Sequence, residues 1–242
     1  MQALKRGVFA LALMYGVLGS SQNNPIKITD YYPLADTNEW RYTAPEGWKD
    51  GDYFSRITAD STHFSGFLKK RDTSASNVKS KGVQSFLHFD ATGAAKMLQL
   101  DTQGLYYVGE LFADGKSYVL FDEPVLWFPT TFPSGAESHI GTGFTRFYNS
   151  GETTRGQFTL TQKITGFETI SVPAGTFIDC IRVDFTNDWD FGKGATARSE
   201  NSYHHAPGVG VVKASARFII KQNGKTLINR LVTPDLKKYY LN

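Results

Sequence analysis

Turn residues between short apolar stretches constrain this chain more than any other feature of its sequence. From residue 31 onward, segments rich in aromatic and β-branched residues are separated by glycine, proline, asparagine and aspartate. Asp114-Gly115 and Asn223-Gly224 each lie between two such segments, which is typical of a β-hairpin whose type I′ turn needs positive φ at both central residues. No stretch beyond residue 21 keeps apolar residues at helical spacing. The pattern predicts an all-β fold made of antiparallel hairpins.

The expected strands follow one another as a meander. The segment 123–133 differs from them because it contains Pro124, Pro129 and Pro133, and proline cannot donate to a sheet ladder, so we expect an edge, a bend or a crossover there. The simplest architecture is an antiparallel meander forming a curved sheet, a half-barrel or a sandwich, after an N-terminal signal helix. The expected strands are 40–42, 53–58, 64–70, 83–89, 96–100, 104–109, 117–121, 143–149, 156–167, 166–172, 177–186, 195–205, 209–221 and 226–232.

The first 21 residues have the three parts of an export signal. Lys5 and Arg6 form a positive region, residues 7–18 are apolar, and Gly19-Ser20-Ser21 supplies small residues for cleavage. The apolar run is shorter than the ~20 residues that cross a bilayer. We therefore expect a bacterial protein that is exported to the periplasm or secreted, with a signal peptide cleaved after Ser21. We do not expect an integral membrane protein.

The same region sets the expected domain organisation. It comprises a signal peptide (1–21), a leader (22–30) and a single β domain (31–242), with two lobes split near 130–142 as the alternative. Val17-Leu-Gly-Ser20 resembles a bacterial lipoprotein box in which serine replaces the lipidated cysteine. Serine cannot form the thioether, so we expect the exported protein to carry no lipid.

The charge balance argues against a nucleic-acid partner. The chain has 26 basic and 23 acidic residues, and removal of Lys5 and Arg6 leaves an excess of one basic residue. Lys69-Lys70-Arg71 and Lys237-Lys238 are short runs that read as solvated faces. Nucleic-acid binding needs a clustered basic footprint. We expect no such partner.

Cys180 is the only cysteine, which excludes an intramolecular disulfide. In a strand over 177–185 it would share a face with Arg182, and this cation is the one hint of a stabilised thiolate. A reactive thiol would take His204 or His205 as its base. The apolar neighbours favour a small packed thiol instead.

The histidines do not form a metal-ligand pattern. His204 and His205 are adjacent, so in a strand their side chains point to opposite faces and cannot chelate one ion. His63, His88 and His139 are scattered and lack close carboxylate or histidine companions at ligand spacing. We expect no metal site and no cofactor.

Asp188 and Asp190 flank Trp189 and would share one face of a strand. Paired carboxylates can hydrolyse glycosides. They can equally be solvent-facing acids around a buried tryptophan, which is the interpretation we favour. No glycine-rich phosphate loop and no Gly-x-Ser-x-Gly elbow occurs in the chain.

Three short blocks together carry a resemblance. They are Tyr32-Pro-Leu-Ala-Asp-Thr-Asn-Glu-Trp-Arg-Tyr42, Val172-Pro-Ala-Gly-Thr-Phe177 and Ala206-Pro-Gly-Val-Gly-Val-Val-Lys213. The set resembles a group of uncharacterised exported bacterial β-rich proteins, in which an aromatic residue precedes the third block as Tyr203 does here. The resemblance implies export and an antiparallel sheet, and it carries no activity. A looser analogy of fold links curved sheets of this kind to half-barrel lipoprotein carriers.

These observations favour an exported, non-catalytic β-protein that binds an apolar or amphiphilic ligand or an envelope partner. The candidate binding residues are Trp127, Tyr203, His204 and His205, because a curved aromatic sheet can line an apolar cavity. We assign no catalytic residue. Two alternatives stay open: an exported hydrolase acting on envelope or extracellular polymers through Asp188, Asp190, His204 or His205, and a structural surface protein.

Overall fold

The computed structural model describes residues 26–45, 53–59, 83–132, 135 and 137–242. Most of these residues lie in strands, and within them helix is confined to the single turn α1 (Ile28–Tyr31). The expected signal helix and the expected strand 64–70 lie outside the described residues. The strands are β1 (Ile26–Lys27), β2 (Glu39–Tyr42), β3 (Phe54–Ala59), β4 (Gln84–Phe89), β5 (Ala95–Leu100), β6 (Gly104–Leu111), β7 (Tyr118–Pro129), β8 (Thr131–Phe132), β9 (Glu137–Phe147), β10 (Thr153–Val172), β11 (Gly175–Asp190), β12 (Ala195–Ala206), β13 (Gly210–Gln222), β14 (Lys225–Val232) and β15 (Leu236–Tyr240).

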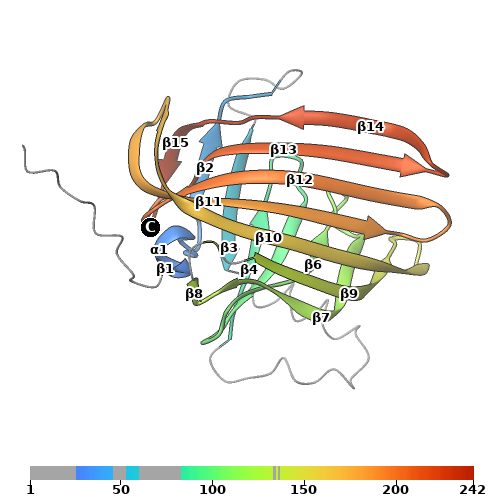
Figure 1. The fold of residues 1–242 in the computed structure, drawn as a ribbon. Coiled ribbons are helices and arrows are strands. Elements are labelled where there is room, and N and C mark those ends of the chain that lie inside the picture. Colours follow the sequence, from blue (N-terminus) through green and yellow to red (C-terminus); the bar gives the residue numbers. More distant parts are fainter. Residues whose placement is uncertain (1–25, 46–52, 60–82, 133–134, 136) are drawn as a thin grey trace, which may run out of the picture.

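One curved sheet holds 13 of these strands (Figure 1). Its order is β14-β13-β12-β11-β10-β9-β7-β6-β5-β4-β3-β2-β15, and every pair of neighbours is antiparallel. The short strands β1 and β8 pair with each other apart from it. The predicted all-β antiparallel meander is confirmed in its curved-sheet form.

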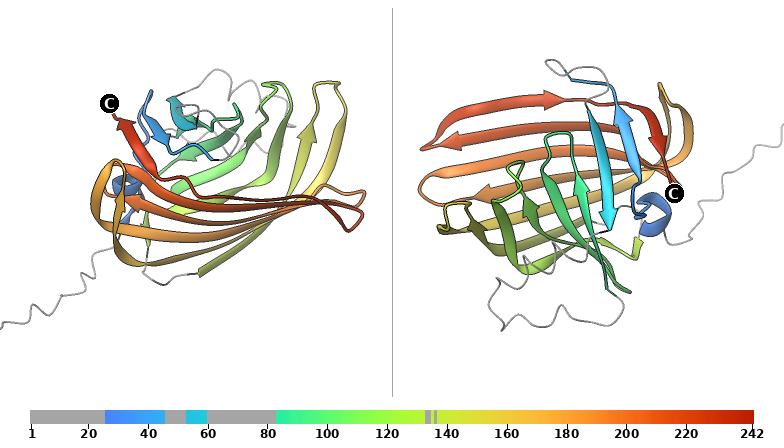
Figure 2. Two further views of the ribbon diagram at one scale, coloured as in Figure 1. Left: turned by 90° about the horizontal axis from the view of Figure 1, so that it is seen from above. Right: turned by 180° about the vertical axis from the view of Figure 1, so that it is seen from behind.

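The two edges of the sheet come from consecutive strands. β14 and β15 are joined by three residues, yet β15 pairs with β2 at the opposite edge. The sheet therefore curls until the two edges approach each other at one end (Figure 2). There Lys213 and Asp235 form an isolated bridge, and the Ala214 amide donates to the Pro234 carbonyl over 3.0 Å. We call this the closing end; elsewhere the sheet stays open.

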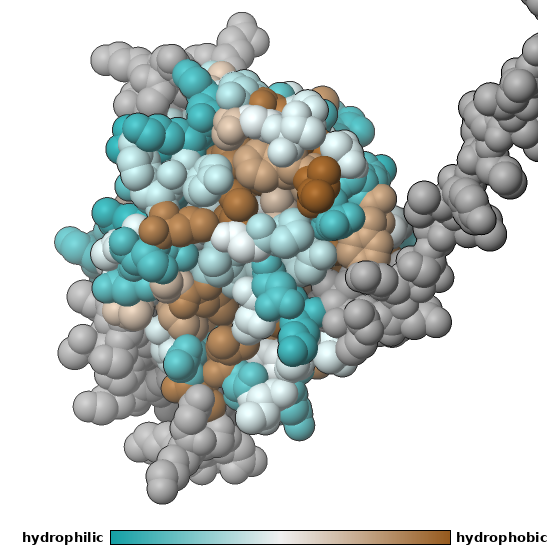
Figure 3. All heavy atoms as spheres, turned by 90° about the vertical axis from the view of Figure 1, so that its left-hand side faces the viewer, coloured by the Kyte–Doolittle hydropathy of each residue, from teal (hydrophilic) through white to brown (hydrophobic). Residues whose placement is uncertain are grey.

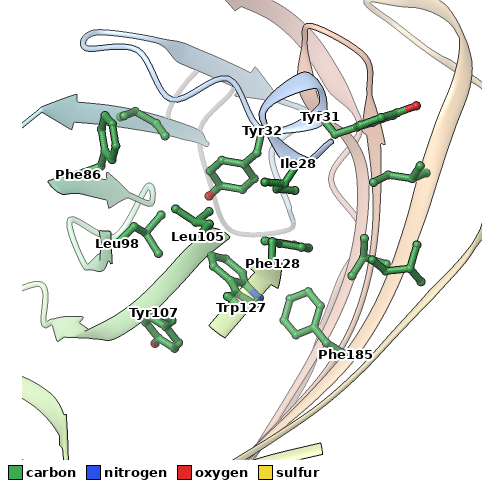
Figure 4. Close-up of a cluster of buried hydrophobic side chains, with 14 of the residues drawn as sticks. Ile28, Tyr31, Tyr32, Phe86, Leu98, Leu105, Tyr107, Trp127, Phe128 and Phe185 are labelled. Atoms are coloured by element: carbon green, nitrogen blue, oxygen red, sulfur yellow. The ribbon is translucent and has the colours of Figure 1, made fainter. Parts of the chain in front are cut away.

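The inner, concave face holds the main core. Along β10 the side chains of Phe158, Leu160, Gln162 and Ile164 are buried against it, while Thr159, Thr161 and Lys163 between them are partly or fully exposed. Burying a large apolar side chain stabilises a fold by about 1.5–3 kcal/mol, so this alternation fixes which face of the strand turns inward. In Figure 4 the aromatic rings of Trp127 and Phe128 lie in the same interior.

The turn α1, whose first three residues belong to the stretch 22–30 expected to be a leader, packs on this interior. Ile28 is only 2% exposed, and Tyr32, which follows α1, is 5% exposed. Figure 4 shows both side chains directed at the core. α1 thereby covers one end of the concave face.

The segment that its prolines predicted to be an edge, a bend or a crossover falls mainly in the second half of β7. β7 pairs with β9 only over Tyr118–Phe121, because the register ends where Phe121 meets Phe144. From Val125 to Pro129 it pairs with β6 alone, with one register shift inside this stretch and another just before it. Among the described strands this half of β7 is a local edge, which is where proline is tolerated.

Candidate functional site

The open part of the concave face is hollowed into a groove of about 370 Å³. We call it the inner groove. One wall comes from β11 to β14 and the other from β4 to β6 with the residues beside them. Ligand pockets commonly occupy about 300–1,000 Å³, so this volume fits a small molecule or one part of a larger one.

Small side chains explain why the groove exists. Ala214 and Ala216 of β13 face inward, and they pair across the sheet with Tyr203 and Asn201 of β12. Ala197 belongs to the same wall. A methyl group fills far less space than the phenylalanines and leucines found elsewhere on the concave face, so the core is not filled to its usual density here.

Aromatic and aliphatic side chains give the groove its apolar surface. Trp189 is held by rings on its other side, since its ring centre lies 4.4 Å from that of Phe158 and 5.3 Å from that of Phe144. Phe218 and Ile220 line the mouth and remain 43% and 37% exposed. The groove is thus apolar at a place where the solvent can reach it.

A charged pair stands on the opposite wall. Lys96 of β5 lies between His88 of β4 and Glu110 of β6 in the strand register. All three side chains line the groove, and the Lys96 ammonium lies 5.9 Å from the ring centre of Trp127. An ammonium held near an aromatic face gains a cation–π attraction and remains able to bind an anion.

His88 is a neutral member of this wall. Its Nδ1 is hydrogen-bonded to the hydroxyl of Tyr32. Burial, followed by the charge of Lys96, lowers the pKa of His88 to about 3. A histidine with this pKa carries no charge near neutrality and is a poor general base.

Neutral amides and a hydroxyl form the floor between the walls. Ser199 Oγ accepts hydrogen bonds from Asn187 Nδ2 over 3.1 Å and from Asn201 Nδ2 over 3.0 Å. Burial, followed by the charge of Asp90, raises the pKa of the nearby Tyr203 to about 12, so its hydroxyl keeps its proton. The groove can therefore offer hydrogen bonds without adding charge.

Of the four predicted binding residues, Tyr203 lines the groove. Trp127 lies in the core behind Lys96 and is 4% exposed. His205 is buried, with Nδ1 3.3 Å from the Tyr31 carbonyl, and burial lowers its pKa to about 4. His204 lies on the outer face, where Nε2 is 3.2 Å from Glu168 Oε2. The two adjacent histidines thus occupy opposite faces, as their spacing predicts.

The four residues considered for hydrolysis are not brought together. Asp188 is bound by Arg198 on the outer face, with Nη1 3.1 and 3.2 Å from its two oxygens. Asp190 accepts the Gly192 amide. His204 pairs with Arg182, six residues further back along β11 than Asp188, which is roughly 20 Å in a strand.

Cys180 is fully buried and lies outside the groove. Burial raises the pKa of its thiol to about 11, as expected for a packed side chain. The strict face alternation expected around it fails, because Asp179 adopts φ of 55° beside a register shift. Both Cys180 and Ile181 then turn inward, while Ile178 is 66% exposed. Within the described residues no group of three histidine, cysteine or carboxylate side chains could hold a metal ion.

Sequence reasoning did not single out Lys96 and Glu110. The available signal was a charged residue inside each of two strands that are otherwise almost wholly apolar or aromatic. In the strand register these two positions are cross-strand neighbours on the concave face. Recognising them as a pair requires that register, which depends on the bulge between Met97 and Leu98.

Comparisons with known proteins place the chain in a family. A model of the DUF3108-like family matches residues 77–218, which include β4 to β12 and most of β13. No protein with a curated description matches the chain. Within the described residues, no helix has the length and apolar character needed to cross a membrane.

Two solved structures are similar over 87% of this chain and 98% of their own. One is a "putative lipoprotein" from Parabacteroides distasonis, with 11% sequence identity and a TM-score of 0.41. The other is a "putative exported protein with YmcC-like fold" from Bacteroides fragilis, with 14% identity and a TM-score of 0.42.

Proposed function

The chain belongs to the DUF3108-like family, and we propose that this member is an exported protein that binds an amphiphilic molecule in its inner groove. The apolar part of the ligand lies against Trp189, Phe218 and Ile220. Its polar or anionic group is bound near Lys96. The protein acts as a binding module, and a single β domain follows the signal peptide.

The observation that carries this proposal is the placement of Lys96. Its ammonium lies in a groove lined mainly by aromatic, aliphatic and neutral polar side chains, 5.9 Å from the ring centre of Trp127, with Glu110 beside it on the same wall. Lysine is costly to bury without a partner, and lysine side chains usually extend to the solvent. A cation on the wall of an apolar groove is the arrangement that recognises a molecule with an apolar body and an anionic head.

The export signal supports the proposed location. Lys5 and Arg6, the apolar run after them and the small residues that end it occur in the order of a bacterial signal peptide. Serine at position 20 supports release without a lipid anchor. The test is N-terminal sequencing of the exported protein, which should begin at Gln22.

The groove is tested with a fluorescent long-chain fatty acid titrated into the purified protein. We expect saturable binding by the wild type and at least a tenfold loss for Ala216→Phe, whose ring occupies the groove. The matched control is Ser215→Phe, on the outer face of the same strand, which should bind as the wild type does. Thermal unfolding of both variants checks that they fold. An unchanged affinity in folded Ala216→Phe would exclude the groove as the binding site.

A further inference from the structure

The hairpin of β13 and β14 has an unusual charge. Residues 201–234 contain no aspartate or glutamate, although the chain as a whole has nearly as many acidic as basic residues. The same stretch contains five basic residues, Lys213, Arg217, Lys221, Lys225 and Arg230. Other arginines of the chain form salt bridges with acidic side chains. Within the described residues, none of these salt bridges includes Lys213, Arg217, Lys221 or Lys225. This hairpin therefore presents positive charge that its own strands do not neutralise.

Exposed leucines lie among these charges. Leu231 pairs with Arg217 in the register, so both lie on the outer face of the sheet. Leu227 lies at the register shift between Ile220 and Lys221, next to Thr226, which pairs with Lys221 of the same outer face. Leu227 is 60% exposed and Leu231 is 62% exposed. Lys213 and Lys221 alternate with Arg217 along the same side of β13 and are exposed. We call the outer side of these two strands the basic-apolar face.

The edge of the sheet continues this surface. Among the described strands β14 is the last on its side, so no described strand pairs with one row of its amide and carbonyl groups, and seven of its eight residues are exposed. Ile228, on its inner face, is 45% exposed. Proteins usually protect such edges with charges or coverage. Lys225 and Arg230 are the charges on this edge strand, and apolar side chains project from both of its faces beside them.

We propose that the basic-apolar face and the β14 edge dock on the surface of a lipid bilayer that carries anionic headgroups. Such a surface supplies phosphates for the lysines and arginines and an acyl boundary for the leucines, within the few ångströms that separate Arg217 from Leu231 across the sheet. Each basic residue near an anionic membrane raises partitioning about fivefold. A rigid protein partner would need matched apolar pockets on both sides of one strand, whereas lipid adapts to both.

Comparison with the opposite end of the molecule shows which property distinguishes the basic-apolar face from other exposed apolar surfaces. Figure 3 views that end, where hydrophobic residues lie between hydrophilic ones. Ile178 is 66% exposed and Phe167 49% exposed on the β10–β11 hairpin. Their sequence neighbours Asp179 and Glu168 are exposed acids, which an anionic membrane would repel. Exposure alone therefore does not select a membrane contact, and the basic residues do.

Contact through the β14 edge would also bring the mouth of the inner groove near the membrane, because Phe218 and Ile220 lie on the inner face of the same hairpin. A ligand could then pass between bilayer and groove. This consequence rests on the proposed function. The docking itself does not, because it depends on the outer face of the hairpin.

The test is flotation of the exported protein with vesicles of phosphatidylcholine alone or mixed with phosphatidylglycerol, at low and at physiological salt. We expect at least tenfold more binding to the mixed vesicles, reduced by salt. Leu227→Ser/Leu231→Ser and Lys213→Gln/Arg217→Gln/Lys221→Gln should each lose at least tenfold. Ile178→Ser, the matched control at the opposite end, should bind as the wild type does. Fatty-acid titration without vesicles should be unchanged in all variants, which separates this proposal from the groove.

Three results would overturn the proposal. The first is equal binding to neutral and anionic vesicles. The second is full binding by both multiple variants. The third is a wild-type dimer that the leucine substitutions convert to a monomer, since this would assign the face to a second copy of the chain.

Discussion

The indole Nε1 of Trp40 donates a hydrogen bond to the carbonyl of Val209, 169 residues later in the chain. Val209 lies in the Ala-Pro-Gly-Val-Gly turn, and Gly210 follows it with φ of 96°. A Cβ atom on Gly210 would stand 3.3 Å from the Trp40 indole, so glycine allows both the turn and the close approach. The Gly208 amide donates to the Asp30 carbonyl over 2.6 Å. The turn therefore binds the first described segment of the chain.

The second sequence block takes part in the same end of the molecule. The Ala174 amide, in the Pro-Ala-Gly-Thr turn, donates to the carbonyl of Leu236 over 2.9 Å, and Leu236 is fully buried. All three blocks that carried the sequence resemblance thus lie at or next to the closing end. The contacts of these blocks hold the first and the last described segments of the chain against the sheet.

Replacing Trp40 tests this arrangement. Trp40→Phe keeps an aromatic ring but leaves the buried Val209 carbonyl without its donor, which should reduce the free energy of unfolding by about 1–3 kcal/mol. Urea denaturation followed by circular dichroism measures the loss. Tyr106→Phe is the control, because it removes an exposed hydrogen bond to Gln103 and should change stability by less than about 0.5 kcal/mol. Equal losses in the two variants would contradict the assignment.

Lys96 should set the preference for an anionic head. Lys96→Met keeps the length of the side chain and removes its charge, so affinity for a fluorescent fatty acid should fall about tenfold, equivalent to ~1.4 kcal/mol. Affinity for the methyl ester of the same acid should hardly change. Lys163→Gln, which removes an exposed lysine of β10, is the control. An equal loss of affinity for the acid and for the ester would show that Lys96 contributes to the shape of the groove and does not bind the anionic head.

Stability should fall in mild acid because of two buried histidines. The folded-state pKa is about 3 for His88 and about 4 for His205, both lowered first by burial from an ordinary value of 6.5. Below pH 6.5 the unfolded chain takes up protons that the folded chain does not. The free energy of unfolding therefore decreases as the pH falls towards those lower values, by about 2 kcal/mol per histidine at pH 5.

Urea denaturation at pH 7.5 and pH 5.0 measures this effect. His88→Gln should show about 2 kcal/mol less difference between the two pH values than the wild type. His139→Gln, at an exposed position of β9, should keep the wild-type difference. A pH dependence that survives unchanged in His88→Gln would show that this imidazole is not the group that titrates.

Cys180 should be inert in the folded protein. It is fully buried and its thiol pKa is raised to about 11, so a disulfide reagent at pH 8 should label it only after unfolding. Ser171→Cys/Cys180→Ala places a thiol at an exposed position near the end of β10 and should react at once. The measurement is the rate of thiol labelling with and without denaturant. Fast labelling of native wild type would contradict the packed position.

Hairpin turns were the part of the fold most readable from sequence. Asp114-Gly115 and Asn223-Gly224 lie where the turns were predicted, because these residue types favour turns locally. Both residues of Asn223-Gly224 have positive φ, whereas at Asp114-Gly115 only Gly115 does, so the type I′ turn predicted there is wrong. The packing of Ile28 and Tyr32 was not readable, since the surface they cover is assembled from distant strands. The groove was missed for a similar reason. Ala214 and Ala216 look like ordinary strand residues until the register places them opposite Tyr203 and Asn201.

The pairing of β15 with β2 also has a consequence for how the chain reaches its native state. Asp235 and Thr43 are hydrogen-bonded across 192 residues, so this contact is among the most non-local in the molecule. Closing so long a loop costs much entropy before any contact compensates for it. We therefore expect a sheet with this topology to fold slowly, on the order of milliseconds to seconds, with the two edges joining late. Until β15 is synthesised, the edge of β2 with which it pairs therefore stays open.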